Sequence, residues 1–259
     1  MDELREKCPW DRKQTIETLR PQTIEETYEL SEAVLNGDMH NISKELGDVL
    51  LHIVFYAKIG KEQGLFEMKD VINNLCNKLI YRHPHVFGDA SAKDAEQVVK
   101  NWEQLKTKEK DGNKTVLSGV PESMPAMIKA YRMQDKARAV GFDWAEKEQV
   151  WEKVEEEIGE FKAELKGLSE ACGAGSVTEE EYKERAQGEL GDLFFSLINA
   201  ARLYNLNPDT ALESTCKKFR RRFTYLENET IKKGRNLSEM TLPEMDKIWE
   251  EAKRMEEKR

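Results

Sequence analysis

Apolar residues recur along this chain at helical spacing, and no segment shows the alternation of apolar and polar residues that a half-buried strand requires. The pattern predicts helices near residues 21–36, 41–62, 68–81, 91–110, 148–166, 178 onward, 208–227 and 243 onward. Residues 49–57 are apolar on nearly every side, which is typical of a helix buried inside a bundle. The expected fold class is therefore all-α.

Local signals mark several ends of these helices. Three pairs of residues have the spacing of an N-terminal capping box, and they are Thr23 with Glu26, Ser91 with Asp94, and Thr178 with Glu181. Gly37 follows the first helix, where a glycine commonly ends a helix. A stretch rich in small residues, 167–177, is expected to form a loop between two helices.

A pattern of acidic residues occurs twice. Each copy reads E-E-x-x-E, a spacer, and then E-L-G-D running into an apolar helix. A later helix in each copy reads CNKLIYRH or CKKFRRRF, and a tryptophan follows. The duplication predicts two tandem helical-bundle domains, over residues 1–110 and 127–259. The linker is expected at 111–126, which contains two glycines and two prolines.

The composition limits the possible partners. The formal net charge is -9, so the field of the protein would repel a nucleic acid polymer, and a small anionic substrate would need local cations or a metal ion. The four cysteines show no C-x-x-C spacing, and there is neither a signal peptide nor an apolar run long enough to cross a bilayer. We therefore expect a cytoplasmic protein with no membrane partner.

The two acidic patterns predict metal sites. On a helix, the second and last acids of E-E-x-x-E share a face, as do the two acids of E-L-G-D. If the two helices pack antiparallel, four carboxylates converge in each copy: Glu26, Glu29, Glu45 and Asp48 in the first, and Glu157, Glu160, Glu189 and Asp192 in the second. Glutamates on a helix face are often simply solvated, but both aspartates directly precede apolar runs, where an acid needs a partner. A hard divalent ion with oxygen ligands fits best, namely Mg²⁺ with Mn²⁺ as a substitute.

Several motifs together resemble one known family. CPWD near the start, EETYEL with ELGDVL, RHPHVFGD, and the second E-E-x-x-E with ELGDLFF and KFRRRF resemble the MazG family of nucleoside triphosphate pyrophosphohydrolases across essentially the whole chain. The resemblance implies an all-α homodimer that uses Mg²⁺ to hydrolyse canonical and non-canonical nucleoside triphosphates, ATP among them, to the monophosphate and pyrophosphate.

By position, the resemblance assigns metal binding and catalysis to Glu157, Glu160, Glu189 and Asp192, and nucleotide binding to Lys153, Lys218, Arg222 and Trp249. This suits the chemistry, because metal ions activate water and neutralise phosphate charge, a carboxylate can take the proton, and lysine and arginine bind phosphates. The counterparts in the first copy are Glu26, Glu29, Glu45 and Asp48 for metal, with Lys78, Arg82 and Trp102 for substrate.

The two copies differ in their cations. Lys153 lies four residues before Glu157, whereas Gln22 lies four before Glu26. In the same way, Arg185 precedes Glu189 where Asn41 precedes Glu45, so Arg185 is a further candidate for substrate binding. A triphosphate carries about four negative charges, so the second copy is expected to be the main catalytic domain. The first copy is expected to be a weaker site or a dimerisation unit.

Three alternatives follow from the same residues. One is a specialised pyrophosphohydrolase of the same superfamily, for dUTP or phosphoribosyl-ATP. Another is a non-catalytic helical scaffold whose acidic grooves bind a basic partner. A di-iron carboxylate bundle is a poor fit, because it needs E-x-x-H and no histidine here follows a glutamate by three residues.

Overall fold

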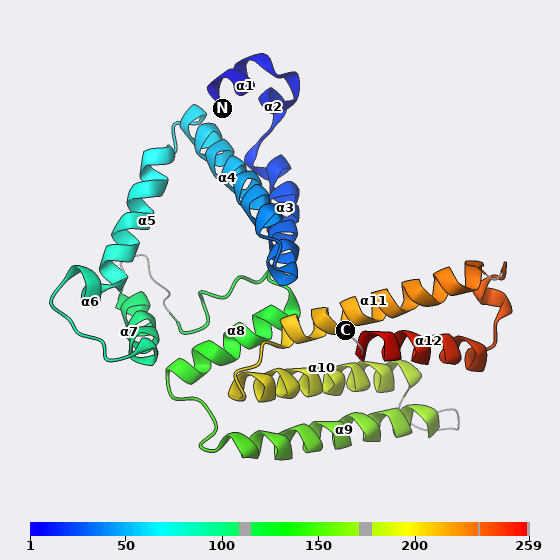
Figure 1. Ribbon diagram of the computed structural model, residues 1–259. Helices are drawn as coiled ribbons and strands as arrows, with labels where there is room; N and C mark the ends of the chain where they lie inside the picture. Colours follow the sequence, from blue (N-terminus) through cyan, green and yellow to red (C-terminus); the bar gives the residue numbers. More distant parts are fainter. Residues whose placement is uncertain (109–114, 171–177, 233, 258–259) are drawn as a thin grey trace. The chain divides into compact units, whose positions relative to one another are not determined.

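The computed structural model describes residues 1–108, 115–170, 178–232 and 234–257, and these residues form helices and connecting turns without any strand (Figure 1). The expected all-α class is confirmed. The chain divides into two compact units, Met1–Trp102 and Glu103–Arg259. The linker expected at 111–126 stays a prediction, and its first four residues, 111–114, lie outside the described part.

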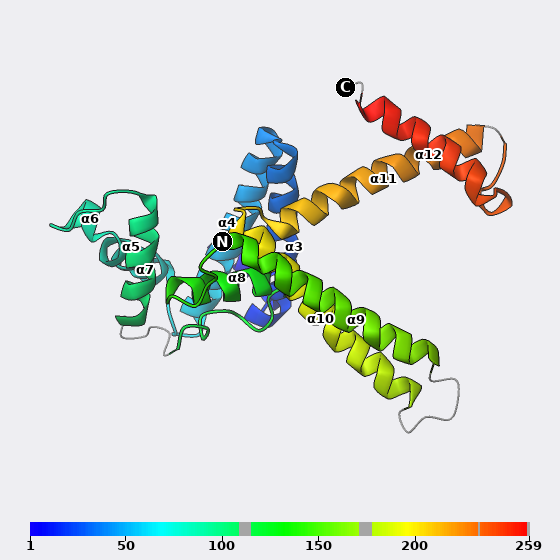
Figure 2. The ribbon, with the colours of Figure 1, turned by 90° about the horizontal axis from the view of Figure 1, so that it is seen from below.

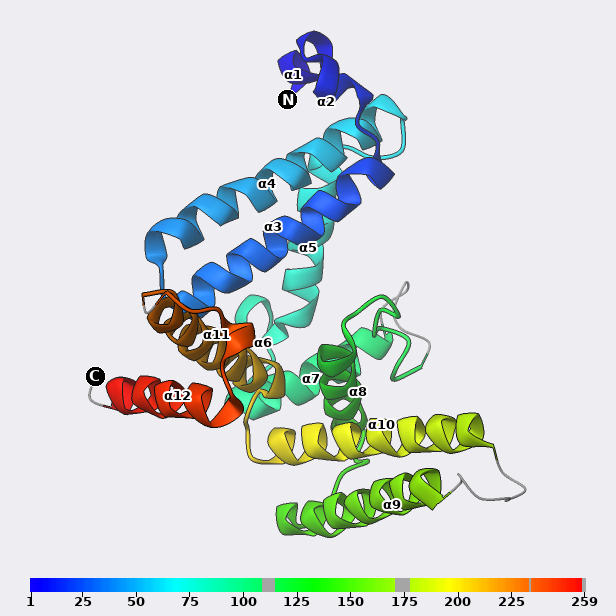
Figure 3. The same cartoon turned by 90° about the vertical axis from the view of Figure 1, so that its right-hand side faces the viewer.

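The first unit is built around a pair of antiparallel helices, α3 and α4, which lie side by side in Figures 1 and 3. Its helices are α1 (Asp2–Lys7), α2 (Pro9–Lys13), α3 (Ile16–Asn36), α4 (Met39–Glu62), α5 (Met68–Arg82) and α6 (Pro84–Phe87), and α7 (Ala95–Lys108) begins in it. Leu19, Phe55 and Ile59 form the buried core between α3 and α4.

Helix α3 begins earlier than the sequence pattern suggested. Thr15 caps it, because the Thr15 and Thr18 side chains each accept a hydrogen bond from the other residue's backbone N–H. The expected cap at Thr23 is wrong, since Thr23 lies inside the helix and donates its hydroxyl to the Leu19 carbonyl at 3.0 Å. The expected end at Gly37 is confirmed, with φ of 66° in the left-handed region that glycine favours.

Two other helix boundaries also differ from those predicted from the sequence. Helix α7 begins at Ala95 rather than near Ser91, because Asp94 itself accepts a hydrogen bond from the Gln97 backbone N–H at 2.8 Å. The loop expected at 167–177 begins later, since α9 continues to Glu170, and 171–177 lie outside the described residues.

The second unit contains a similar antiparallel pair, α9 and α10, shown side by side in Figure 2. Its elements are α8 (Ala126–Ala139), η1 (Lys147–Gln149), α9 (Val150–Glu170), α10 (Glu179–Leu203), α11 (Pro208–Lys232), η2 (Leu237–Glu239) and α12 (Leu242–Glu257). The Thr178–Glu181 capping box at the start of α10 is confirmed. Helix α8, which the sequence analysis did not predict, packs on α10 and α11. Among the described helices, none combines the length and apolar content of a membrane span.

The expectation that residues 49–57 are buried on all sides is only partly right. Phe55 and Ala57 are buried, but Leu50 and Leu51 are 56% and 45% exposed. The matching residues of α10, Phe194 and Phe195, are 54% and 43% exposed. A pair of helices covers only one side of each member, so an apolar strip remains on the other side of α4 and of α10.

Candidate active site

Three carboxylates meet between α9 and α10 in the second unit. Glu157 and Glu160 project from α9 and Glu189 from α10, and one carboxylate oxygen of each lies within 4.8 Å of the others. The spacing of three residues places the two α9 glutamates on one face, and antiparallel packing brings Glu189 opposite them. We call this group the second acidic cluster.

The first unit repeats this geometry. Glu26 and Glu29 on α3 meet Glu45 on α4, again with carboxylate oxygens within 4.8 Å of one another, and we call this group the first acidic cluster. Neither three-residue group includes Asp48 or Asp192. The structure thus brings together three of the four predicted acids in each copy.

Like charges act on one another in both clusters. Burial, followed by the charges of Glu160, Asp192 and Glu157, raises the pKa of Glu189. Burial, followed by Glu45 and Glu26, raises the pKa of Glu29. Both shifts have the direction expected when burial and neighbouring negative charges disfavour the ionised carboxylate. Asp192 is therefore close enough to act electrostatically on the second cluster.

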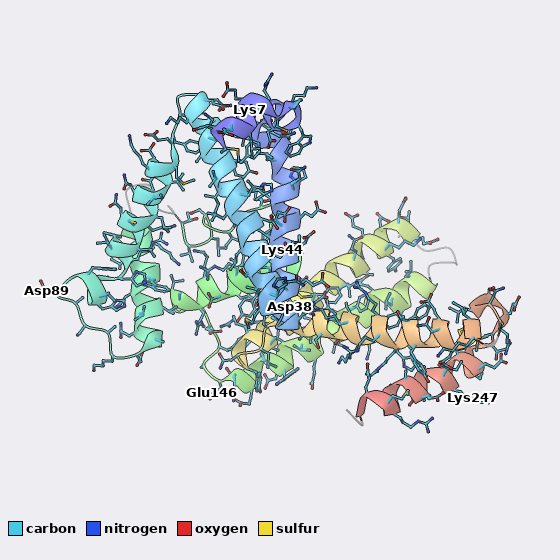
Figure 4. The ribbon with its side chains drawn as sticks, turned by 45° about the horizontal axis from the view of Figure 1, so that its top comes forward. Lys7, Asp38, Lys44, Asp89, Glu146 and Lys247 are labelled. Carbon is cyan, nitrogen blue, oxygen red and sulfur yellow. The ribbon has the colours of Figure 1, made fainter. Side chains whose placement is uncertain are left out.

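The most deeply buried acid of each cluster has a lysine beside it. Glu157, only 5% exposed, pairs with Lys153 at 2.7 Å, and Lys153 also reaches Glu156 at 3.0 Å. These hydrogen bonds, to Glu157 first and then Glu156, raise the pKa of Lys153. Glu45, also 5% exposed, pairs with its neighbour Lys44 at 3.1 Å, and Figure 4 labels Lys44 on α4.

The first cluster contains a buried carboxylate oxygen without a hydrogen-bond partner among the described residues, and a second such oxygen belongs to Glu164, beside the second cluster. Glu45 Oε2 in the first unit is buried without a hydrogen-bond partner among the described residues. Glu164 Oε2 in the second unit is in the same state, and the Glu164 charge contributes to the raised pKa of Glu189. Glu164 follows Glu160 by four residues on the same face of α9, a spacing that the sequence analysis passed over. An all-oxygen donor set with unsatisfied buried oxygens fits a hard divalent cation.

A cavity of about 770 Å³ adjoins the second acidic cluster. Lys153, Glu157 and Asp192 line it beside the cluster. The rest of the wall is mainly apolar or aromatic and comes from the turns before α8, from α8, from the segment before α9 and from α9 and α10. It includes Leu117, Met133, Phe142, Trp144 and Phe195. This size and lining suit a small ligand with one charged end.

A polar network around the buried Arg202 belongs to the same cavity wall. Arg202 Nη1 donates to Asp143 Oδ2 at 3.0 Å, and Arg202 Nη2 donates to Asn199 Oδ1 at 2.8 Å. Burial works to raise the pKa of Asp143, but the hydrogen bonds and charge of Arg202 outweigh it and lower that pKa. Asn199 and Arg202 lie three residues apart on α10, but only packing of the segment before α9 against α10 brings Asp143 to them, so the sequence pattern did not reveal the network.

Comparison with known proteins identifies the family. The model of the MazG nucleotide pyrophosphohydrolase domain matches residues 14–87, which contain the first acidic cluster. The nucleoside triphosphate pyrophosphohydrolase/pyrophosphatase MazG of Thermotoga maritima is 41% identical over 256 residues, covering 98% of this chain and 92% of that protein. The chain belongs to the MazG family.

Further relatives of this MazG protein agree. The nucleoside triphosphate pyrophosphohydrolase of Escherichia coli K12 is 37% identical over 251 residues, which cover 96% of this chain and 91% of that protein. An uncharacterized protein, YabN of Bacillus subtilis, is 42% identical over 250 residues, which cover 96% of this chain but only 49% of YabN. Membership of the MazG family confirms the expectation that the chain is a hydrolase.

The remaining predicted substrate residues of this MazG protein lie elsewhere in its structure. Lys218 and Arg222 are on α11 and Trp249 is on α12, and none of these three lines the described cavity. Arg222 Nη2 instead pairs with Glu256 at 2.8 Å, and its guanidinium carbon lies 6.0 Å from the centre of the Trp249 ring. Of the predicted cations, only Lys153 lines the cavity, and Arg185 lies over the Tyr182 ring at 6.0 Å.

The first copy of the MazG chain has a different interior. Lys78 and Arg82 lie on α5, and Trp102 on α7 packs edge-on against the His83 ring at 5.0 Å between centroids. Phe55 occupies on α4 the position that Asn199 occupies on α10, seven residues after the aspartate of E-L-G-D. Phe55 is 3% exposed and packs with Leu19 and Ile59, so a residue of the apolar core stands where the second unit has the cavity-lining Asn199.

Proposed function

We propose that this MazG protein hydrolyses nucleoside triphosphates to the nucleoside monophosphate and pyrophosphate, and that its second unit is the main catalytic site. The observation that carries the proposal is the second acidic cluster, which adjoins a cavity that Lys153 lines. The Thermotoga maritima and Escherichia coli relatives are nucleoside triphosphate pyrophosphohydrolases by name, which supports the reaction. The first unit is a weaker site or a dimerisation unit.

Glu157, Glu160 and Glu189 would hold Mg²⁺, or Mn²⁺ in its place, with Asp192 beside them. The bound ion would lower the pKa of a coordinated water and neutralise charge on phosphate oxygens. The Lys153 ammonium binds a phosphate oxygen in the part of the cavity beside the cluster. A carboxylate of the cluster accepts the proton of the water that attacks the α-phosphorus.

The substrate range that we propose is broad, with ribo- and deoxyribonucleotides, ATP and non-canonical bases included. A cavity of about 770 Å³ with mainly apolar walls supports it, since such walls contact any planar base. We retain the cytoplasmic location expected from the sequence as part of this proposal.

We also propose a homodimer. The exposed strips that include Leu50 and Leu51 on α4 and Phe194 on α10 are apolar surfaces that a second copy would cover. Arg185, Lys218, Arg222 and Trp249 remain proposed nucleotide-binding residues. Lys218, Arg222 and Trp249 lie on α11 and α12 and do not line the cavity. We therefore propose that, in the dimer, they contact the substrate bound to the partner subunit.

Product analysis tests the reaction. The purified protein is incubated with a panel of ribo- and deoxyribonucleoside triphosphates and Mg²⁺, and the products are separated by ion-exchange chromatography. We expect monophosphate and pyrophosphate in equal amounts from several bases, with no diphosphate. Turnover of dUTP or phosphoribosyl-ATP alone would show a specialised enzyme. An absence of metal-dependent turnover would favour the acidic scaffold.

A further inference from the structure

Gln134 on α8 is a buried amide in the cavity wall that the proposed chemistry leaves without a role. Its side chain is among those that line the cavity, and the residue is 6% exposed. Nε2 donates a hydrogen bond to the Phe195 carbonyl on α10 at 2.8 Å. Oε1 is buried and has no hydrogen-bond partner in the part of the chain that the structure describes.

The orientation of this amide is fixed by its neighbour. A backbone carbonyl only accepts hydrogen bonds, so the NH₂ group of Gln134 must face Phe195, and the reversed amide would set two acceptors against each other. The Oε1 acceptor therefore faces away from α10 by necessity. Buried acceptors are nearly always satisfied in folded proteins, so the unsatisfied Oε1 in a cavity wall points to a donor that arrives with a ligand.

Asn199 supplies the complementary group. Its Oδ1 accepts from Arg202 Nε at 3.1 Å and from Nη2 at 2.8 Å, and Arg202 is itself held by Asp143. This network leaves the NH₂ group of Asn199 as a donor in the cavity wall. The cavity thus offers one oriented acceptor, Gln134 Oε1, and one oriented donor, Asn199 Nδ2.

Asn199 and the acids occupy different stretches of the cavity wall, and Gln134 contacts α10 between them, at the carbonyl of Phe195. Asn199 follows Asp192 by seven residues, which is two turns, or about 10 Å, along α10. Phe142 and Trp144 add flat aromatic surface to the same wall. A triphosphate bound at Lys153 and the acidic cluster would therefore extend its nucleoside along the cavity towards the amides.

We propose that Gln134 Oε1 accepts a hydrogen bond from the nucleoside part of the substrate, with the Asn199 amide donating beside it; this rests on the proposed function. The donor that we favour is an N–H on the edge of the base. Adenine and cytosine present an exocyclic amino group, and guanine and uracil present a ring N–H, so one acceptor serves every common base. Gln134 then selects for nucleobases that carry a donor without choosing among them. A sugar hydroxyl is the other source of such a donor.

Nucleotide analogues separate these sources. We compare kcat/KM for ATP, purine riboside triphosphate, which lacks the 6-amino group, and 2′,3′-dideoxy-ATP, which lacks both sugar hydroxyls. Wild-type protein should prefer ATP to purine riboside triphosphate roughly tenfold, and Gln134→Met, which keeps the side-chain length, should reduce that preference to about one. Loss of a preference for ATP over dideoxy-ATP instead would identify a sugar hydroxyl as the donor and still support an accepting Gln134.

The control variant is Thr230→Val. Thr230 is 1% exposed and donates to the Leu226 carbonyl at 2.8 Å within α11, so this variant also removes a buried hydrogen bond but does so away from the cavity. Its substrate preferences should equal those of the wild type.

Three results would overturn the inference. In the first, Gln134→Met lowers kcat/KM equally for all three substrates, which would show a structural role. In the second, the wild type has the same kcat/KM for all three substrates, which would exclude a hydrogen bond from the base or the sugar to Gln134. This result needs no variant, so it holds even if Gln134→Met does not fold. In the third, the wild type turns over no triphosphate, which alone among the three would also overturn the proposed function.

Discussion

At the scale of single residues, the Lys153–Glu157 ion pair gives one lysine two competing partners. Lys153 neutralises a carboxylate of the second acidic cluster at 2.7 Å, and it also lines the cavity where the triphosphate is proposed to bind. Mg²⁺ therefore competes with Lys153 for Glu157, and the substrate phosphate competes with Glu157 for Lys153. The two roles predict opposite effects when the ammonium is removed.

We expect Lys153→Met to raise KM for ATP roughly tenfold, because a charge-assisted contact to phosphate is lost. The same variant should need less Mg²⁺ for half-maximal activity, since no ammonium then competes for Glu157. Initial rates over a matrix of ATP and Mg²⁺ concentrations measure both quantities. The matched control is Lys44→Met in the first unit, which should leave both values close to wild type. If Lys153→Met raised both the KM for ATP and the Mg²⁺ concentration for half-maximal activity, Lys153 would not compete with Mg²⁺ for Glu157.

Asp143 tests the polar network of the cavity wall. Its side chain is 19% exposed and that of Arg202 is 6% exposed, so Asp143→Asn should lower the free energy of unfolding by about 3 kcal/mol at pH 7. The folded-state pKa of Asp143 is lowered from its ordinary value of 3.8, so this stabilisation is present above that value and is lost as the pH falls through the folded-state pKa. Urea unfolding of both proteins at pH 7 and near pH 3 measures the difference, which should shrink at the lower pH. A difference of the same size at both pH values would show that Asp143 acts through packing rather than charge.

At the scale of helices, the sequence predicted the elements better than their ends. Thr178 and Thr23 have the same capping-box spacing to a glutamate, yet only Thr178 caps a helix. The capping box of Thr15 with Thr18 begins α3 eight residues, or more than two turns, before Thr23. The local pattern alone could not decide which threonine caps the helix. Helix α8 was missed, although it supplies Met133, Gln134 and Ala137 to the cavity wall.

The helical spacing also explains which site residues could be predicted. Glu157 and Glu160 share a face of one helix, so their proximity is a local property of the sequence. The amide of Gln134 and the network of Asp143 with Arg202 depend on contacts between segments about 60 residues apart, which spacing does not encode. The sequence order of Lys218, Arg222 and Trp249 did not predict where these residues lie relative to the cavity.

The position of α11 and α12 predicts complementation between subunits. Glu160→Gln and Arg222→Ala should each be inactive as pure proteins if both residues serve the reaction. When the two variants are mixed in equal amounts, with subunit exchange, half of the dimers are mixed and each has one intact site, so roughly a quarter of wild-type activity should return. Activity before and after mixing, with size-exclusion chromatography to establish the dimer, provides the measurement. Recovery of no activity by exchanged dimers would contradict the proposal that Arg222 serves the partner subunit.

At the scale of the whole molecule, the duplication gives two acidic clusters of the same geometry with different surroundings. The second cluster has Lys153 at 2.7 Å from its buried glutamate and an adjoining cavity. The first has Phe55 packed into an apolar core where the second unit places Asn199. The difference supports the proposal that the second unit is the main catalytic unit.

The most direct test of this account compares Glu160→Gln with Glu29→Gln, the same substitution at matching positions of the two clusters. Each variant is assayed with ATP and Mg²⁺ for release of AMP and pyrophosphate, beside the wild type and with thermal unfolding as a check on folding. We predict that Glu160→Gln loses activity by a factor of at least about 100, as is usual when a metal-binding or proton-accepting carboxylate is removed, whereas Glu29→Gln retains most of it. Loss of activity in Glu29→Gln with full activity in Glu160→Gln would contradict the account and move catalysis to the first unit.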